Sequence, residues 1–197
     1  MKKGWEIKKL GEVCVTSAGG TPLKTNKAYY ENGDIPWLMS GEVCRKYITD
    51  AEKRITKLGM DNSSAKLFGV NTVVVAVYGA TAGQVGILKF ETTTNQAVCG
   101  IFPNKNILPE LLYYLFLSYK SELVAQAIGN AQPNISQQKI KDAPIPVPPL
   151  SEQERIVETL NALSAQCKQL EANCRTTIAE CDALKQAILR EAFNTED

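Results

Sequence analysis

The side chains of this 197-residue chain that are best suited to chemistry are its cysteines, because the sequence contains no histidine. The six cysteines are Cys14, Cys44, Cys99, Cys167, Cys174 and Cys181, and no two of them form a C-x-x-C pair. Zinc sites use thiolates or imidazoles at close paired spacing, so this pattern predicts no metal site. The absence of histidine also excludes the Ser-His and Cys-His pairs that activate a nucleophile.

The carboxylates offer no alternative catalytic site. Glu31 and Asp34 have no organised partner in the sequence, and neither an Asp…Glu-x-Lys nuclease pattern nor an Asn/Asp-Pro-Pro-aromatic methyltransferase motif is present. An autonomous enzyme is therefore the least favoured class of function. Transfer of a methyl group from labelled S-adenosylmethionine to DNA, without partners, is expected to be absent.

A glycine-rich segment, residues 78–86 (YGATAGQVG), could surround a ligand. It lacks the G-x-x-x-x-G-K-[ST] phosphate loop, and no acidic residue follows at the distance that binds a ribose. Two interpretations remain. The segment is a tight loop between strands, or it presents backbone amides and the side chains of Tyr78, Thr81 and Gln84 to a ligand.

Residues 24–37 interleave basic, polar and aromatic side chains, as nucleic-acid-binding surfaces do. Lysines bind phosphates, whereas amides and hydroxyls contact base edges. The candidates are Lys24, Thr25, Asn26, Lys27, Tyr29 and Tyr30, with Lys66 as a further phosphate contact. The alternative is that the lysines lie on an ordinary solvated face. Trp37, in the apolar stretch IPWL, is expected to belong to the core.

A third candidate DNA-facing loop is residues 129–136 (GNAQPNIS). Its polar side chains Asn130, Gln132 and Asn134 either contact DNA or, with Ser136, serve only the chemistry of a turn.

The distribution of charge along the chain is a weak further indication of DNA binding. Residues 1–60 carry 11 basic and 7 acidic side chains (net +4), and residues 151–197 carry 5 and 9 (net −4), so a polyanion is expected to meet the first part of the chain.

The elements that position these loops belong to an α+β fold. Residues 1–143 predict a strand-rich globular domain, with β-branched strand candidates at 70–78, 85–90 and 97–102. Residues 109–128 predict a helix that begins at a proline and ends before a glycine. The long polar segments 17–43 and 78–86 are expected to be functional or mobile loops.

Four prolines at positions 144, 146, 148 and 149 predict a stiff junction, residues 144–150, which ends the globular domain. A helix over residues 151–197 is expected to follow. Ser151 is the N-cap candidate, Glu154 completes a capping box, and Leu150 supplies the hydrophobic staple.

That helix carries a heptad repeat. The a positions are Leu160, Cys167, Cys174, Cys181 and Ile188, and the d positions are Ile156, Leu163, Leu170, Thr177 and Leu184. A strict seven-residue repeat over more than four heptads predicts a coiled coil. So narrow an apolar stripe needs a partner helix. Three of the cysteines are then small apolar seam residues.

No run of about 18 apolar residues predicts a membrane span, and no apolar segment follows the N-terminal lysines as in a secretory signal. A cytoplasmic protein is the expectation.

Together these motifs resemble the specificity subunit of type I restriction–modification systems. The matching segments, in the order of the family, are WEIKKLGEV (5–13), GGTP (19–22), GDIPWLMSGEV (33–43), VVVAVYGATAGQVGI (73–87), NQAVCGI (95–101), QPNIS (132–136) and IPVPPLSEQERIV (145–157). The last segment, which leads from prolines into a long helix, is the most specific.

The resemblance implies a target-recognition domain and a helical spacer that bind double-stranded DNA without catalysis. It also implies partners: methyltransferase (modification) subunits and restriction/translocase subunits, which use S-adenosylmethionine, ATP and Mg²⁺. The usual subunit of this family has two recognition domains and two antiparallel helices, whereas this sequence has one of each. The unpaired seam therefore predicts an antiparallel homodimer, which would read an inverted repeat with a spacer set by helix length. The alternative, from another class, is a coiled-coil scaffold whose globular head binds protein.

Overall fold

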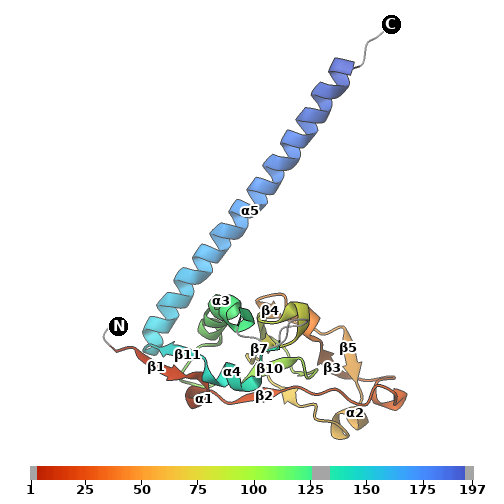
Figure 1. Ribbon diagram of the computed structural model, residues 1–197, viewed down its shortest axis with the longest axis vertical. Helices are drawn as coiled ribbons and strands as arrows, with labels where there is room; N and C mark the ends of the chain where they lie inside the picture. The colour runs from red at the N-terminus through yellow and green to blue at the C-terminus, as the bar shows by residue number, and fades with distance from the viewer. Residues whose placement is uncertain (1–3, 126–133, 194–197) are drawn as a thin grey trace. The chain divides into compact units, whose positions relative to one another are not determined.

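Two sheets form the centre of the part of the chain that carries the candidate loops (Figure 1). The computed structural model describes residues 4–125 and 134–193, and it divides into two units, residues 1–154 and residues 155–197. The larger sheet has the strand order β2-β10-β7-β8-β4, and the smaller one has the order β5-β3-β9-β6. The pairs β3–β9 and β4–β8 are parallel and the others antiparallel, so the predicted α+β class is confirmed.

The strands of the larger sheet are β2 (Thr16–Ala18), β4 (Tyr47–Ile48), β7 (Val73–Ala76), β8 (Val85–Leu88) and β10 (Val98–Ile101). Those of the smaller sheet are β3 (Ile35–Leu38), β5 (Lys53–Ile55), β6 (Leu67–Phe68) and β9 (Thr92–Thr94). Short helices lie between them: α1 (Leu10–Val13), η1 (Lys27–Tyr29), η2 (Ser40–Glu42), α2 (Lys57–Asp61) and η3 (Gly79–Thr81).

The three strands predicted from β-branched runs are β7, β8 and β10. Every residue of these strands is buried, which explains why their sequences are apolar throughout and do not alternate. The segment 17–43, expected to be a long loop, is only partly irregular, because it contains β3. Trp37 on this strand is 3% exposed, so its predicted place in the core is confirmed.

Glycine allows the two sheets to meet. Phe68 on β6 of the smaller sheet is fully buried, and a Cβ atom at Gly100 on β10 of the larger sheet would overlap its ring. Phe102, just after β10, stacks on Phe68 with ring centroids 5.5 Å apart. Gly100 therefore supplies the space into which the aromatic side chain packs.

Helix α3 (Pro109–Ala125) packs against β7 and β8 of the larger sheet. It confirms the predicted helix over its described length, beginning at the expected proline. Its buried residues are Leu111, Leu112, Phe116 and Leu123. A second helix, α4 (Gln137–Asp142), is capped by the hydroxyl of Ser136, which accepts a hydrogen bond from the Lys139 N–H at 3.2 Å.

The proline-rich segment differs from the expected spacer. Its first four residues form β11 (Pro144–Val147), which pairs antiparallel with β1 (Glu6–Lys9) in a sheet of two strands. The two prolines of β11 alternate with Ile145 and Val147. Prolines at alternate positions of an edge strand leave the N–H groups of the intervening residues free to pair. The segment is thus part of the folded unit.

Helix α5 (Leu150–Phe193) is the predicted long helix. It begins at Leu150, so Ser151 lies within its first turn and the expected N-cap at Ser151 is wrong. The first hydrogen bonds run from the N–H groups of Glu152 and Gln153 to the carbonyl of Pro149, at 2.9 and 3.0 Å. A carbonyl from the proline run therefore starts the helix.

Candidate nucleic-acid interface

Two of the loops predicted to contact DNA leave the same end of the larger sheet. Both β2 and β7 run antiparallel to β10, and their last residues, Ala18 and Ala76, pair with Cys99 and Val98 at its start. From these ends the chain continues into residues 19–34 and 77–84. The sheet topology therefore brings together loops that are distant in the sequence.

Close backbone contacts hold the start of the first loop. The Gly20 N–H donates to the carbonyl of Thr94 at 2.9 Å, and Nε1 of Trp37 donates to the carbonyl of Gly20 at 3.0 Å. A Cβ atom at Gly20 would overlap the backbone of Ser64 and Ala65, so this approach requires glycine. The loop thus starts from a fixed point on the core.

In this loop, two of the predicted binding residues, Asn26 and Tyr30, have side chains with structural roles. The Asn26 side chain accepts a hydrogen bond from the Ala28 N–H at 3.2 Å and caps η1. Tyr29 takes part through its backbone, because its carbonyl accepts from the Thr56 N–H at 2.9 Å, and its side chain is half-buried. The hydroxyl of Tyr30 donates to the Pro22 carbonyl at 2.5 Å, and burial raises the pKa of this phenol above its ordinary value of 10.0. These groups shape the loop.

The remaining candidates in the loop, Lys24, Thr25 and Lys27, are exposed. Lys66 is exposed as well, and its Nζ donates to the hydroxyl of Ser17 on β2 at 3.0 Å. A lysine in this position can exchange a neutral hydroxyl for a phosphate oxygen, which is a stronger, charge-assisted partner. The exposed set therefore contains three amines and one hydroxyl.

The second loop is a turn built by glycine. Gly79 and Gly83 have φ values of +69° and +79°, which favour glycine, and η3 begins at Gly79. Tyr78 is 41% exposed, and Thr81 donates to its carbonyl at 3.4 Å. The Oε1 atom of Gln84 is buried without a hydrogen-bond partner in the described part of the chain.

The third candidate loop is described only in part. Asn134 is exposed and forms an isolated antiparallel bridge with Tyr78, which joins the end of this loop to the second loop. Asn130 and Gln132 lie outside the described residues. The order of the candidates in space therefore differs from their order in the sequence, since residue 134 adjoins residue 78.

Sequence reasoning missed two features of this unit. Gln96 is exposed and accepts a hydrogen bond from the hydroxyl of Thr21 at the base of the first loop. Its only signal was its place in the motif NQAVCGI. Gln153 is fully buried at the start of α5, where its side chain makes three hydrogen bonds to the backbone.

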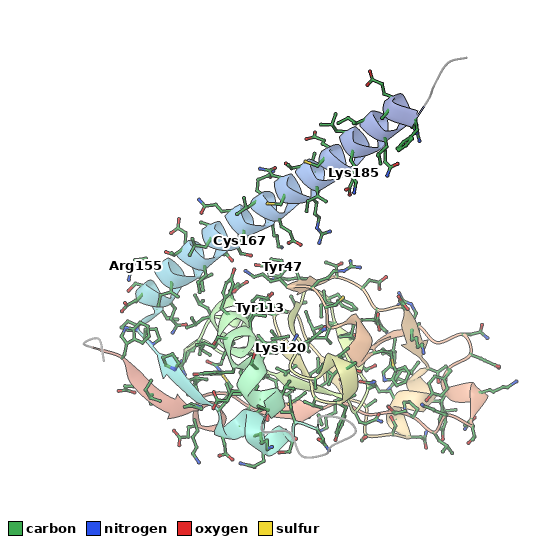
Figure 2. All side chains as sticks on the ribbon, turned by 45° about the horizontal axis from the view of Figure 1, so that its top comes forward. Tyr47, Tyr113, Lys120, Arg155, Cys167 and Lys185 are labelled. Carbon is green, nitrogen blue, oxygen red and sulfur yellow. The ribbon has the colours of Figure 1, made fainter. Side chains whose placement is uncertain are left out.

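A lysine–tyrosine cluster was also missed. Nζ of Lys46 lies 4.5 Å from the ring centroid of Tyr114 and 5.4 Å from that of Tyr113, and it donates to the Tyr114 hydroxyl at 3.1 Å. Nζ of Lys89 lies 4.8 Å from the centroid of the Tyr47 ring. Figure 2 labels Tyr47 and Tyr113 of this cluster. Burial raises the pKa of Tyr113, and the charge of Lys46 lowers it in part. The members of this cluster lie at the start of β4, on α3 and just after β8, so no local spacing in the sequence could reveal it.

Helix α5 presents most of its predicted seam to solvent. Leu163, Leu170, Leu184 and Ile188 are between 51% and 63% exposed, and Cys167, Cys174 and Cys181 are exposed free thiols (Figure 2). Thr177 is exposed too, whereas Ile156 and Leu160 are partly buried. Contact of this seam with a second helix stays a prediction.

Within residues 4–125 and 134–193, no three cysteine, aspartate or glutamate side chains gather into a group that could hold a metal ion. Over the same residues, no helix is both long and apolar enough to cross a membrane.

Sequence comparison connects the chain to DNA specificity proteins. The family described as "Type I restriction modification DNA specificity domain" matches residues 2–180. The chain is 33% identical over 161 residues to the type I restriction enzyme EcoR124I/EcoR124II specificity subunit of Escherichia coli, which covers 79% of this chain and 40% of that protein. It is 30% identical over 164 residues to the MjaIX specificity subunit of Methanocaldococcus jannaschii, covering 81% and 38%.

Solved structures share the fold. A chain from work on complex assembly and conformational transition of the type I R-M system superposes with a TM-score of 0.80 at 25% identity, covering 99% of this chain and 47% of that one. The HsdS subunit from Thermoanaerobacter tengcongensis superposes with a TM-score of 0.73 at 24% identity, covering 99% and 46%. This chain thus spans less than half the length of the relatives it matches.

Proposed function

The chain belongs to the family of type I restriction modification DNA specificity domains, and we propose that it recognises a DNA sequence on behalf of a type I restriction–modification complex. The observation that carries this proposal is the family match over residues 2–180, which includes all the candidate loops and most of α5. The common sheet end from which two of these loops depart supports it independently.

In this proposal some exposed side chains bind phosphates and others contact bases. Lys24, Lys27 and Lys66 bind phosphates, because their amines are exposed. Such phosphate contacts position the protein on DNA and carry no sequence information. Thr25, Tyr78 and Asn134 have exposed polar side chains, which contact the base edges in this proposal. Asn26 and Tyr30 act on DNA only through the shape of the loop that their side chains hold.

The active form proposed is a homodimer with antiparallel α5 helices. The chain has one recognition unit and one long helix, and it covers 40% of its E. coli relative. Two identical units related by a two-fold axis would read an inverted repeat separated by an unread spacer. The apolar seam of α5, which is largely exposed, supplies the surface for this pairing.

The proposed partners are methyltransferase and restriction/translocase subunits, which this chain directs to the bipartite target. S-adenosylmethionine, ATP and Mg²⁺ are then bound by those subunits. The chain itself is proposed to be non-catalytic, so that labelled S-adenosylmethionine and DNA give no methyl transfer until a modification subunit is added.

The test is selection of DNA from a random-sequence pool by the purified protein, with and without the modification subunit, read by mobility shift and sequencing. Enrichment of one inverted repeat with a constant spacer is the expected result. Affinity for that repeat should fall steeply with added salt, because phosphate contacts release counterions. A pool that stays unenriched under both conditions refutes the proposal. Salt-insensitive or absent DNA binding favours the alternative, a coiled-coil scaffold whose head binds protein.

A further inference from the structure

In one antiparallel register, every residue in the seam of α5 meets a seam residue of a second copy of the helix. On the basis of the proposed homodimer, we propose that the two α5 helices pair with their two-fold axis beside Ala172, the centre of the seam from Ile156 to Ile188. Isoleucine and leucine occupy both ends of this seam, whereas the three cysteines and Thr177 lie in its middle together with Leu170.

In an antiparallel pair, each a position packs beside a d position of the second helix. An axis beside Ala172 gives five kinds of layer, each of which occurs twice. The outer layers are Ile156 with Ile188 and Leu160 with Leu184. The inner layers are Leu163 with Cys181, Cys167 with Thr177, and Leu170 with Cys174. All ten seam residues find an apolar or small partner, and the outermost layers pair like with like.

Shifting one helix by a heptad leaves seam residues without a partner. In one direction Leu160 meets Glu191 of the second copy, and Ile156 passes beyond the described end of α5. In the other direction Leu184 meets Gln153, which is already fully buried in the first unit. The register beside Ala172 is therefore the one that pairs the whole repeat.

The positions that flank the seam favour a second copy over a charged partner. In the antiparallel arrangement e positions meet e positions, and g positions meet g positions. Around the axis, Asn173 meets Asn173 of the second copy, and Glu171 meets Glu171. Each Glu171 carboxylate already accepts a 2.6 Å hydrogen bond from Nη2 of Arg175 on its own helix, which offsets the repulsion. Of the flanking e and g positions from 159 to 187, only Glu171, Glu180 and Lys185 are charged.

This register has a consequence for the thiols. All three seam cysteines occupy a positions, so each faces a d residue of the second copy, and none of the d residues is a cysteine. A parallel pair would instead place each cysteine beside the same cysteine of the second helix. Disulfide formation needs Cβ atoms about 4 Å apart, so oxidation distinguishes the two arrangements.

The experiment uses the full chain with C44A, C167A and C181A, which leaves Cys174 as its one exposed native cysteine. Cys14 and Cys99 are buried and are kept. Into this parent protein one d-position cysteine is introduced at a time, giving L163C, L170C and T177C variants. Light scattering first measures the mass of each reduced protein. Mild oxidation and non-reducing electrophoresis then measure the fraction of covalent dimer.

The expected result is a covalent dimer for L170C, at least tenfold more than for the parent, L163C or T177C. A covalent dimer confined to L163C or to T177C means a helix shifted by one heptad and overturns the register. Covalent dimers of all four proteins, the parent included, mean parallel helices and overturn it as well. So do monomeric reduced proteins, or dimers that never cross-link. DNA selection is measured separately on the reduced parent, so a parent that selects no sequence while L170C cross-links refutes the proposed function and supports the register.

Discussion

Trp37 joins the core to the first candidate DNA-binding loop, residues 19–34. It is 3% exposed, and its indole N–H donates to the carbonyl of Gly20. Replacing Trp37 with Phe removes that donor and leaves a small cavity, which should lower the free energy of unfolding by about 2–3 kcal/mol. Urea unfolding followed by circular dichroism measures the loss.

Trp5 is the matched control. Its indole N–H also donates, to Oε2 of Glu152 at 2.9 Å, but in a partly buried position where water can replace the carboxylate. Trp5→Phe should therefore lower the unfolding free energy by about 1 kcal/mol or less. Equal losses for the two variants would mean that the hydrogen bond to Gly20 does not hold the loop.

Cys99 makes stability depend on pH in the alkaline range. Burial raises the pKa of its thiol from 9.0 to about 12. Between these values the unfolded chain has lost the thiol proton while the folded chain keeps it, so the folded form binds more protons and stability falls as pH rises. From pH 8 to pH 10 the free energy of unfolding of the wild-type protein should fall by about 1 kcal/mol more than that of Cys99→Ala.

Urea unfolding at the two pH values measures this difference, with Cys44→Ala, which removes an exposed thiol, as the control. A Cys99→Ala protein whose stability falls as steeply as that of the wild type would contradict the assignment.

At the level of single residues, the sequence predicted which side chains belong to the core better than which partners the polar side chains bind. The sequence correctly placed Trp37 in the core, and contact of residues 24–37 with DNA stays a prediction. The sequence could not separate exposed Lys24 from Tyr30, because the Tyr30 hydroxyl is satisfied by a carbonyl eight residues away. Side chains satisfied by local backbone and those left for a ligand have the same residue types.

At the level of elements, Gln153 fixes the start of α5. Its Oε1 accepts from the Leu108 N–H, and its Nε2 donates to the carbonyls of Asn106 and Pro148, all at 2.9 Å. Gln153→Ala leaves these three backbone groups without their partner and should lower the free energy of unfolding by about 3 kcal/mol or more. Urea unfolding tests this, because a two-state loss shifts the midpoint and leaves the slope unchanged.

Gln169→Ala is the control on the same helix. Gln169 is exposed and its side-chain amide donates to Oδ1 of Asn173, one turn away, so the change should stay within about 0.5 kcal/mol. If Gln153→Ala were as mild as Gln169→Ala, the start of α5 would be fixed by the prolines alone.

The sequence predicted the elements with strong periodicity and missed those held by distant pairing. The β-branched runs became β7, β8 and β10, and the heptads became α5. The strand β11 could not be predicted, because its prolines argue against pairing until a lone edge partner, β1, is known. Short strands such as β4, with two residues, carry too little pattern to be read at all.

At the scale of the whole molecule, the proposed dimer predicts how DNA affinity responds to salt. The logarithm of the binding constant falls with the logarithm of salt concentration by about 0.9 for each phosphate neutralised. Two recognition units on one inverted repeat neutralise twice as many phosphates as one unit does. Leu170, near the centre of the seam, is 63% exposed in the single chain. Leu170→Asp puts a carboxylate there and should therefore give a monomer with about half the salt slope of the wild type. Gln169→Asp adds the same charge one residue away, outside the seam, and should remain a dimer with nearly the full slope. Light scattering and mobility shifts on the selected repeat, over a series of salt concentrations, measure both quantities. A Leu170→Asp protein that stays dimeric, or a monomer that keeps the full slope, would show that the seam does not couple the two recognition units on DNA.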